Sequence, residues 1–187
     1  MIRTYKVNAI VLARRNIGEA DKLITLFTKE YGKKKVLAKG IRRVSSRRAP
    51  YLEQFSYIQA LIRVGKTLDY LTEVSPLGTF SFIRQRLERI GFAYIVSELT
   101  DRLTAENQEA EVIFDDLVAF MERLNQKEMQ RSEAQQLTIL FKKNILTTLG
   151  FIGRNFSMHE IDLDRQIESI LERKMMSPLL LASIQLK

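Results

Sequence analysis

The first 75 residues or so carry apolar side chains at every second position, with short polar turns between these stretches. The alternation covers residues 7–14, 35–40 and 57–64, and residues 23–28 and 67–74 are expected to form strands as well. A period of two residues is typical of strands that bury one face. Gly18, Gly32 and Gly65 lie in the intervening turns, where glycine tolerates a positive φ. The pattern therefore predicts five β-strands.

Residues 41–50 interrupt this alternation with four arginines, two serines and a proline, which indicates a loop. Five short strands that end in a hairpin are what a small OB-type barrel requires. A five-stranded SH3-like barrel fits the same alternation, so the pattern alone leaves both barrels open.

The period changes after Pro76-Leu77-Gly78, and helical spacing begins at Ser81. Apolar stripes at helical spacing run through 87–99, 114–124 and 137–149. Gly150 stands where a C-cap glycine would end the third helix. A fourth helix is expected over about 160–174, and Pro178 begins a short apolar segment. We expect an α+β protein, with an OB-type barrel domain over 1–78 and an α-helical domain over 79–187.

Composition excludes several classes of protein and site. No run of about 18 uncharged apolar residues occurs, so no membrane-spanning helix is expected. The first residues lack the apolar core of a signal peptide. Cysteine is absent and His159 is the single histidine, which argues against disulfides, thiolate metal sites and catalytic triads. A soluble intracellular protein is therefore expected.

Charge is distributed unevenly along the chain, which has a net charge of +8. Residues 1–80 hold 16 Lys and Arg against 6 Asp and Glu, whereas residues 81–187 hold 14 against 16. An asymmetry of this kind favours nucleic acid or an anionic membrane as the partner of the basic half. That half is predicted to be strands rather than a basic amphipathic helix, which argues against the membrane.

A dense group of cations lies in the predicted barrel with almost no carboxylate among them. Such a group suits a groove for a nucleic-acid backbone, with bases stacked on aromatic rings. Tyr31, Tyr51, Phe55 and Tyr57 flank the group, although Phe55 and Tyr57 are expected in the core or at the junction of the two domains. The alternative is a solvated strand edge that its charges protect from aggregation. The candidate phosphate-binding residues are Arg14, Arg15, Lys22, Lys33, Lys34, Lys35, Lys39, Arg42, Arg43, Arg47 and Arg48.

No catalytic or metal site is expected from the acidic residues or the glycines. Asp115 and Asp116 are adjacent on a predicted helix and point in different directions, and Asp162 and Asp164 lie near a predicted helix start. Neither a phosphate-binding GxxxxGK(S/T) loop nor a nucleophile elbow occurs. We therefore expect a protein that is not an enzyme, without a metal or cofactor.

Several elements, in order, resemble the RecO family of bacterial recombination mediators. The stretch 15–33, with its Gly18-Glu19-Ala20-Asp21 turn, is similar to the amino-terminal signature of that family. The basic step Lys39-Gly40-Ile41-Arg42-Arg43, the element Leu52-Glu53-Gln54-Phe55 and the helix end Leu149-Gly150-Phe151 follow in the family's order.

The resemblance implies an OB-fold followed by a helical domain. It further implies binding of single- and double-stranded DNA, annealing of complementary strands, and cooperation with RecR in loading a RecA-type recombinase during repair. A cytoplasmic, nucleoid-associated location is implied as well. Many members carry a zinc-binding cysteine insert after the Leu-Gly-Tyr element, and this chain has no cysteine there. The chain is also short for the family.

The resemblance also implies that the helical domain binds the acidic, apolar-ended tail of single-stranded-DNA-binding protein. Such a tail requires a small apolar pocket rimmed by cations. The candidate rim residues are Arg123, Lys127, Arg131, Lys142 and Lys143.

The function expected from the sequence is thus a DNA-binding and strand-annealing mediator of recombination. An RNA-binding OB-fold protein of translation or ribosome assembly is the alternative, and it would prefer structured RNA and would not anneal strands. A third possibility is a scaffold whose cations bind acidic protein tails.

Overall fold

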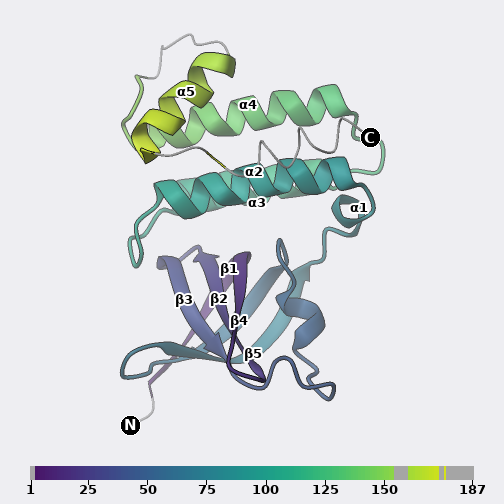
Figure 1. Ribbon diagram of the computed structural model, residues 1–187, viewed down its shortest axis with the longest axis vertical. Helices are drawn as coiled ribbons and strands as arrows, with labels where there is room; N and C mark the ends of the chain where they lie inside the picture. Colours follow the sequence, from purple (N-terminus) through teal and green to yellow (C-terminus); the bar gives the residue numbers. More distant parts are fainter. Residues whose placement is uncertain (1–2, 154–159, 173–174, 176–187) are drawn as a thin grey trace. The chain divides into compact units, whose positions relative to one another are not determined.

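The computed structural model describes residues 3–153, 160–172 and 175, and it divides the chain into two compact units. One unit comprises Met1–Phe80 together with Thr104–Phe114, and the other comprises Ser81–Leu103 together with Asp115–Lys187. Strands make up most of the first unit and helices make up the second (Figure 1). The expected helix over 160–174 and the apolar segment after Pro178 fall partly or wholly outside the described residues.

The first unit is a closed five-stranded barrel, as the alternating pattern predicts. The order around the barrel is β1-β2-β3-β5-β4, and all neighbours are antiparallel except β3 and β5. This is the OB-type arrangement, with an α+β architecture for the whole chain. The strands are β1 (Thr4–Ile17), β2 (Asp21–Thr28), β3 (Gly32–Ala38), β4 (Tyr57–Arg63) and β5 (Asp69–Gly78).

The barrel core is built from the inward positions of the strands. Val7, Ala9 and Val11 of β1 are buried against inward residues of the other strands, among them Ile24 and Ile62. Burying a valine or isoleucine side chain contributes about 1.5–3 kcal/mol to stability. The residues between them face outward, so the register that fills the core also determines which polar side chains lie on the outer surface.

The loop expected over 41–50 contains the start of a short 3-10 helix, η1 (Ala49–Leu52), which the sequence pattern did not indicate. Pro50 lies in its first turn, where the fixed φ of proline suits a helix start. Leu52 is buried with the barrel core, and Ile41 at the beginning of the loop is buried there too. These two apolar anchors tie both ends of residues 41–50, which we call the basic loop, to the barrel.

The segment Thr104–Phe114 belongs to the barrel unit, although it lies far beyond residue 78, where the sequence suggested a domain boundary. The backbone N–H of Asn107 donates to the Lys33 carbonyl oxygen at 2.9 Å. A Cβ atom at Gly32 would lie 1.8 Å from the Gln108 carbonyl oxygen, so the close approach requires glycine there. The Phe114 ring is buried 6.2 Å from that of Phe27.

The second unit consists of helices, as the change of period at Ser81 predicts. They are α1 (Ser81–Arg84), α2 (Leu87–Leu103), α3 (Glu111–Leu124, whose first turn lies in the barrel unit), α4 (Arg131–Thr148) and α5 (Glu160–Leu171). None of the described helices is both long and apolar enough to cross a membrane.

Both ends of α4 are capped by local sequence. At the start, the Gln130 N–H donates to the Glu133 carboxylate at 3.1 Å. At the end, Gly150 has a φ of +79°, and the N–H groups of Gly150 and Phe151 donate to the carbonyls of Thr147 and Leu146. This is the Schellman arrangement, so the C-cap predicted for Gly150 is confirmed.

Candidate nucleic-acid interface

A groove of about 520 Å³ lies between β1, β2 and the basic loop, and we call it the cationic groove. Four cations line it, and Glu53 is the carboxylate among the described lining residues. The apolar part of its lining comes from Ile41, Val44, Ala49, Pro50 and Leu52. The four cations are Arg14, Lys22, Arg42 and Arg43.

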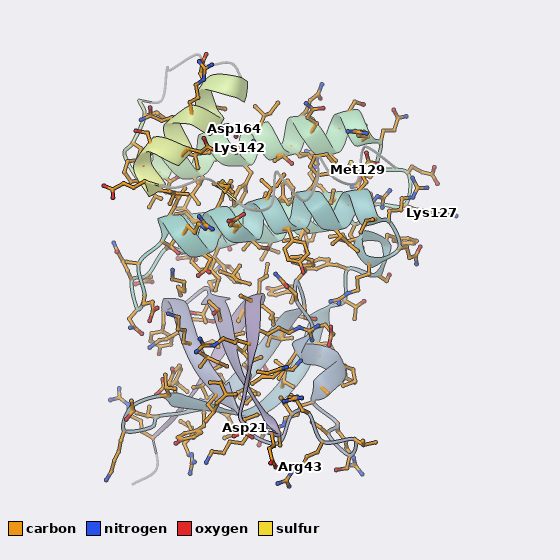
Figure 2. The ribbon with its side chains drawn as sticks, viewed as in Figure 1. Asp21, Arg43, Lys127, Met129, Lys142 and Asp164 are labelled. Atoms are coloured by element: carbon orange, nitrogen blue, oxygen red, sulfur yellow. The ribbon has the colours of Figure 1, made fainter. Side chains whose placement is uncertain are left out.

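Hydrogen bonds to the β1–β2 turn hold the basic loop at the groove. The Gly40 N–H donates to the Asp21 carboxylate at 2.7 Å, and the Arg42 N–H donates to the Ala20 carbonyl at 2.9 Å. Gly40 has a φ of +65°, which residues with a Cβ atom rarely adopt. The loop therefore turns sharply and places Arg43 at the same end of the barrel as Asp21 (Figure 2).

The charges in the groove are not all equally available. Arg14 forms an ion pair with Glu53, so its charge is already compensated. Arg42 and Arg43 are exposed, and the Arg42 guanidinium donates to the Gly18 carbonyl oxygen at 3.2 Å. The three lining cations that are available to a polyanion are therefore Lys22, Arg42 and Arg43.

The run Lys33-Lys34-Lys35 does not reach the groove, contrary to the single cationic patch that the sequence suggested. Lys33 is 8 % exposed, because the segment with Asn107 lies against it. Lys34 is on the opposite face of β3, with its ammonium 5.6 Å from the Tyr31 ring centre. The period of two residues in a strand separates adjacent lysines in this way.

Lys35 is exposed, but Glu106 lies beside it. The two side chains form an ion pair, and the hydrogen bond from Lys35 lowers the pKa of the Glu106 carboxyl below its ordinary value. A carboxylate 71 positions further along the chain thus compensates this lysine. Sequence inspection could not detect this pairing.

The Arg48 side chain is engaged by the protein's own backbone and is not available to a phosphate. Its guanidinium donates to the carbonyl oxygens of Leu71 at 2.8 Å, Thr72 at 3.2 Å and Lys39 at 2.7 Å. Arginine suits such a site because its donors form a fixed fork. We therefore assign Arg48 to holding the basic loop against β5.

The remaining candidate cations, Arg15, Lys39 and Arg47, are exposed but do not line the groove. Lys39 lies 5.1 Å from the ring centre of Tyr70, and Arg63 lies 4.9 Å from the same centre. Neither Tyr70 nor Arg63 was a candidate from the sequence. The alternation of the strands indicates that both face outward, but only the pairing of β3 with β5 brings Lys39 to them.

The aromatic residues that flank the basic loop divide between core and surface. Phe55 is buried, and the Tyr57 ring lies 6.2 Å from that of Phe114, as expected for packing residues. Tyr31 and Tyr51 are partly exposed, but neither lines the groove.

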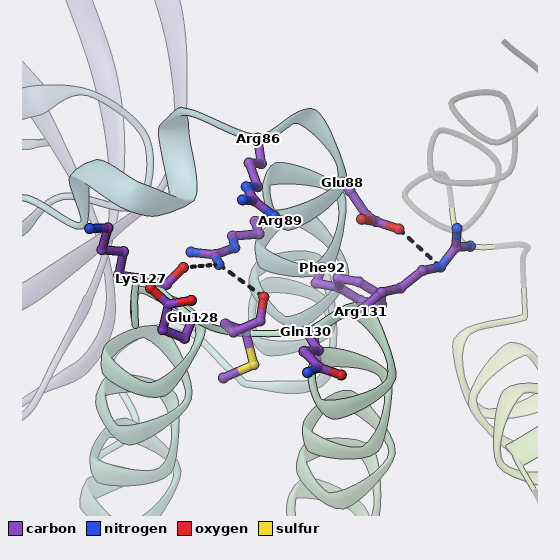
Figure 3. A pocket seen from close by; sticks show the side chains of 10 residues that line it. Arg86, Glu88, Arg89, Phe92, Lys127, Glu128, Gln130 and Arg131 are labelled. Atoms are coloured by element: carbon purple, nitrogen blue, oxygen red, sulfur yellow. Dashed lines mark hydrogen bonds and ion pairs between the residues drawn. The ribbon is translucent and has the colours of Figure 1, made fainter.

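The helical unit has a polar pocket of about 420 Å³ between the start of α2 and the α3–α4 loop (Figure 3). The buried Arg89 guanidinium donates to the Gln126 carbonyl at 2.8 Å, the Lys127 carbonyl at 3.0 Å and the Met129 carbonyl at 2.9 Å. Burial lowers the pKa of this guanidinium, and the three carbonyl oxygens compensate its charge. Arg89 therefore shapes the loop that bears Lys127 and leads into Arg131.

A smaller apolar pocket of about 140 Å³ lies between α3 and α4. Phe120, Phe141 and the half-exposed Leu140 line it, with Arg123 among the lining residues. The expected rim cations are thus divided: Arg123 lines this pocket, and Lys127 and Arg131 line the polar one. Lys142 is buried and paired with Asp164 of α5 at 2.6 Å (Figure 2). Lys143 lines neither pocket.

No cluster of three side chains able to hold a metal ion occurs in the described part of the chain. Asp162 and Asp164 are both on α5, and Asp164 is engaged by Lys142. His159 lies outside the described residues.

The closed barrel and its groove define an OB-type protein with a cationic surface groove, followed by a helical unit. Residues 1–80 match the family model described as Recombination protein O N terminal, and residues 84–153 match Recombination protein O C terminal. The chain belongs to the RecO family.

Curated proteins similar to this chain carry the name of the same family. The chain is 36% identical over 150 residues to a DNA repair protein RecO of Roseiflexus sp. (strain RS-1), which covers 80% of this chain and 51% of that protein. It is 34% identical over 150 residues to the DNA repair protein RecO of Pelotomaculum thermopropionicum, covering 80% and 57% of the two chains. The chain thus spans little more than half the length of these relatives.

Proposed function

We propose that this protein acts in DNA repair and recombination as a DNA-binding and strand-annealing mediator. It binds single- and double-stranded DNA through phosphates, and it does so without catalysing a reaction. The observation that carries the proposal is the cationic groove. Lys22, Arg42 and Arg43 line it, and Glu53, the one carboxylate among its described lining residues, is already engaged by Arg14. Family membership supports the same role.

Annealing follows from the electrostatics of such a surface. Two complementary strands repel each other, and a basic surface lowers this repulsion and raises the rate at which they meet. Three available cations would neutralise about three phosphates, so the logarithm of the affinity for a single strand should fall with the logarithm of salt with a slope of about −2.

Annealing of two complementary oligonucleotides tests this function. We expect the protein to accelerate annealing, and added salt to reduce the acceleration along with the affinity, because both depend on phosphate contacts. The annealing rate would be followed by fluorescence quenching between labelled strands. An unchanged rate, combined with tighter binding of structured RNA, would contradict the proposal and favour an RNA-binding protein.

We further propose that the helical unit binds the acidic tail of single-stranded-DNA-binding protein at the small apolar pocket between α3 and α4. The pocket offers apolar walls from Phe120 and Phe141 for the apolar end of the tail, and Arg123 for its carboxylates. We also propose that the protein cooperates with RecR and that the two together help load a RecA-type recombinase onto DNA.

Strands coated with single-stranded-DNA-binding protein test the tail contact. We expect annealing of coated strands to depend on the acidic tail, and Leu140→Glu to remove that dependence because it places a like charge in the pocket. Gln136→Glu, which adds the same charge at an exposed position of α4, should leave it intact. Equal effects of the two substitutions would contradict this assignment.

A further inference from the structure

A row of outward-facing residues crosses all five strands of the barrel in continuous register. Arg15 of β1 is paired with Leu23 of β2, Leu23 with Leu37 of β3, and Leu37 with Tyr70 of β5. Tyr70 is then paired with Arg63 of β4, and Arg63 with Thr4 at the start of β1. Directly paired residues share one face of a sheet, so these six side chains form one band, which we call the Tyr70 row.

The middle of the Tyr70 row is apolar and partly open. Leu23, Leu37 and Tyr70 are all half-buried, whereas their inward neighbours Ile24 and Leu71 are buried in the barrel core. These half-buried side chains form an apolar strip across three neighbouring strands of the barrel.

Cations border this apolar surface. Arg15 and Arg63 flank the apolar middle of the row, and the ammonium of Lys39 lies 5.1 Å from the Tyr70 ring centre. Both cationic groups at Tyr70 are within the distance of about 6 Å at which a ring attracts a cation. Asp69, the adjacent carboxylate, instead accepts hydrogen bonds from the Tyr5 hydroxyl at 2.6 Å and the Gly65 N–H at 3.1 Å.

The Tyr70 row and the cationic groove meet at one turn. Lys39 precedes Gly40 on the side of the row, and Arg42 and Arg43 follow it on the side of the groove. Arg48 fixes this junction, because its guanidinium bonds the Lys39 carbonyl and two carbonyls of β5 next to Tyr70.

Resting on the proposed DNA-binding function, we propose that the Tyr70 row is a second subsite that takes the unpaired bases of single-stranded DNA. A single strand lies with phosphates in the cationic groove, passes Lys39, and places bases on Tyr70 and Leu37. Aromatic rings beside a positively charged groove are how single-strand binders hold bases of any sequence. Paired bases are stacked inside a duplex and cannot reach this surface, so the subsite distinguishes single strands from duplexes.

The test compares Tyr70→Leu, Tyr70→Phe and Tyr31→Leu in binding to a 20-nucleotide oligo(dT) and to a duplex of equal length. We expect Tyr70→Leu to weaken single-strand binding about five- to a hundredfold, the range that loss of one stacked base produces. Duplex binding should change less than twofold. Tyr70→Phe keeps the ring and should keep the affinity, and Tyr31→Leu removes a partly exposed tyrosine outside the row.

Three results would overturn the subsite: unchanged single-strand affinity in Tyr70→Leu, an equal loss for single strand and duplex, or an equal loss in Tyr31→Leu. Thermal unfolding of each variant separates loss of binding from loss of fold. If the unaltered chain binds neither DNA, the proposed function itself fails. If it binds both and Tyr70→Leu changes neither, only the subsite fails.

Discussion

Replacing Arg42 and Arg43 together by glutamate is expected to weaken DNA binding by about a hundredfold or more at moderate salt. The change replaces two of the three available cations of the groove with like charges that repel phosphates. Both side chains are exposed, and the substitution removes the hydrogen bond from the Arg42 guanidinium to Gly18, a modest cost that the fold should withstand. Fluorescence anisotropy with labelled DNA measures the affinity, and circular dichroism measures the fold.

A control with the same change in net charge is needed, because any loss of positive charge weakens binding at long range. Lys127→Glu with Arg165→Glu provides it, since both residues are exposed in the helical unit and neither lines the groove. We expect the fold loss of affinity in this control to be less than about a tenth of the fold loss in the groove variant. Similar losses in the two variants would mean that net charge, rather than the groove, governs binding.

Phe114→Ala is expected to lower the free energy of unfolding of the barrel unit by about 3–5 kcal/mol. The Phe114 side chain is 1 % exposed, and its ring lies 6.2 Å from the rings of both Phe27 and Tyr57. Its removal leaves a cavity where the segment Thr104–Phe114 rests on the barrel. Alanine favours a helix more than phenylalanine, so a loss of helix propensity would not explain the effect.

Val112→Ala serves as the matched control, because Val112 is in the same turn of α3 and is 61 % exposed. A surface substitution of this kind usually changes stability by less than about 0.5 kcal/mol. Urea unfolding followed by circular dichroism compares the two variants. If Phe114→Ala costs no more than Val112→Ala, the segment does not stabilise the barrel.

The strands and helices could be predicted because they depend on local patterns. Short apolar segments bounded by turn residues identify β1 to β5, and the C-cap at Gly150 needs only a residue that tolerates a positive φ. The cations Arg42 and Arg43 could be predicted as exposed, since they lie in a loop rich in arginine and serine. The roles of these cations in DNA binding stay predictions.

Other features depend on contacts between residues far apart in the chain. Lys35 and Arg48 belong to the same cluster in the sequence as Arg42. In the structure, however, Lys35 forms an ion pair with Glu106, and Arg48 donates hydrogen bonds to three backbone carbonyls. Tyr70 lies 31 positions after Lys39, and only the parallel pairing of β3 with β5 places them together.

The sequence by itself determined the five strands, the change to helices, the charge asymmetry and the resemblance to one family, because each follows from residue types at short spacing. Only the tertiary structure decided which cations share a groove, which are engaged by distant partners, and that residues 104–114 complete the barrel unit. The physical reason is that barrel closure and strand register bring residues together across long loops, and no local preference of the chain specifies which residues meet.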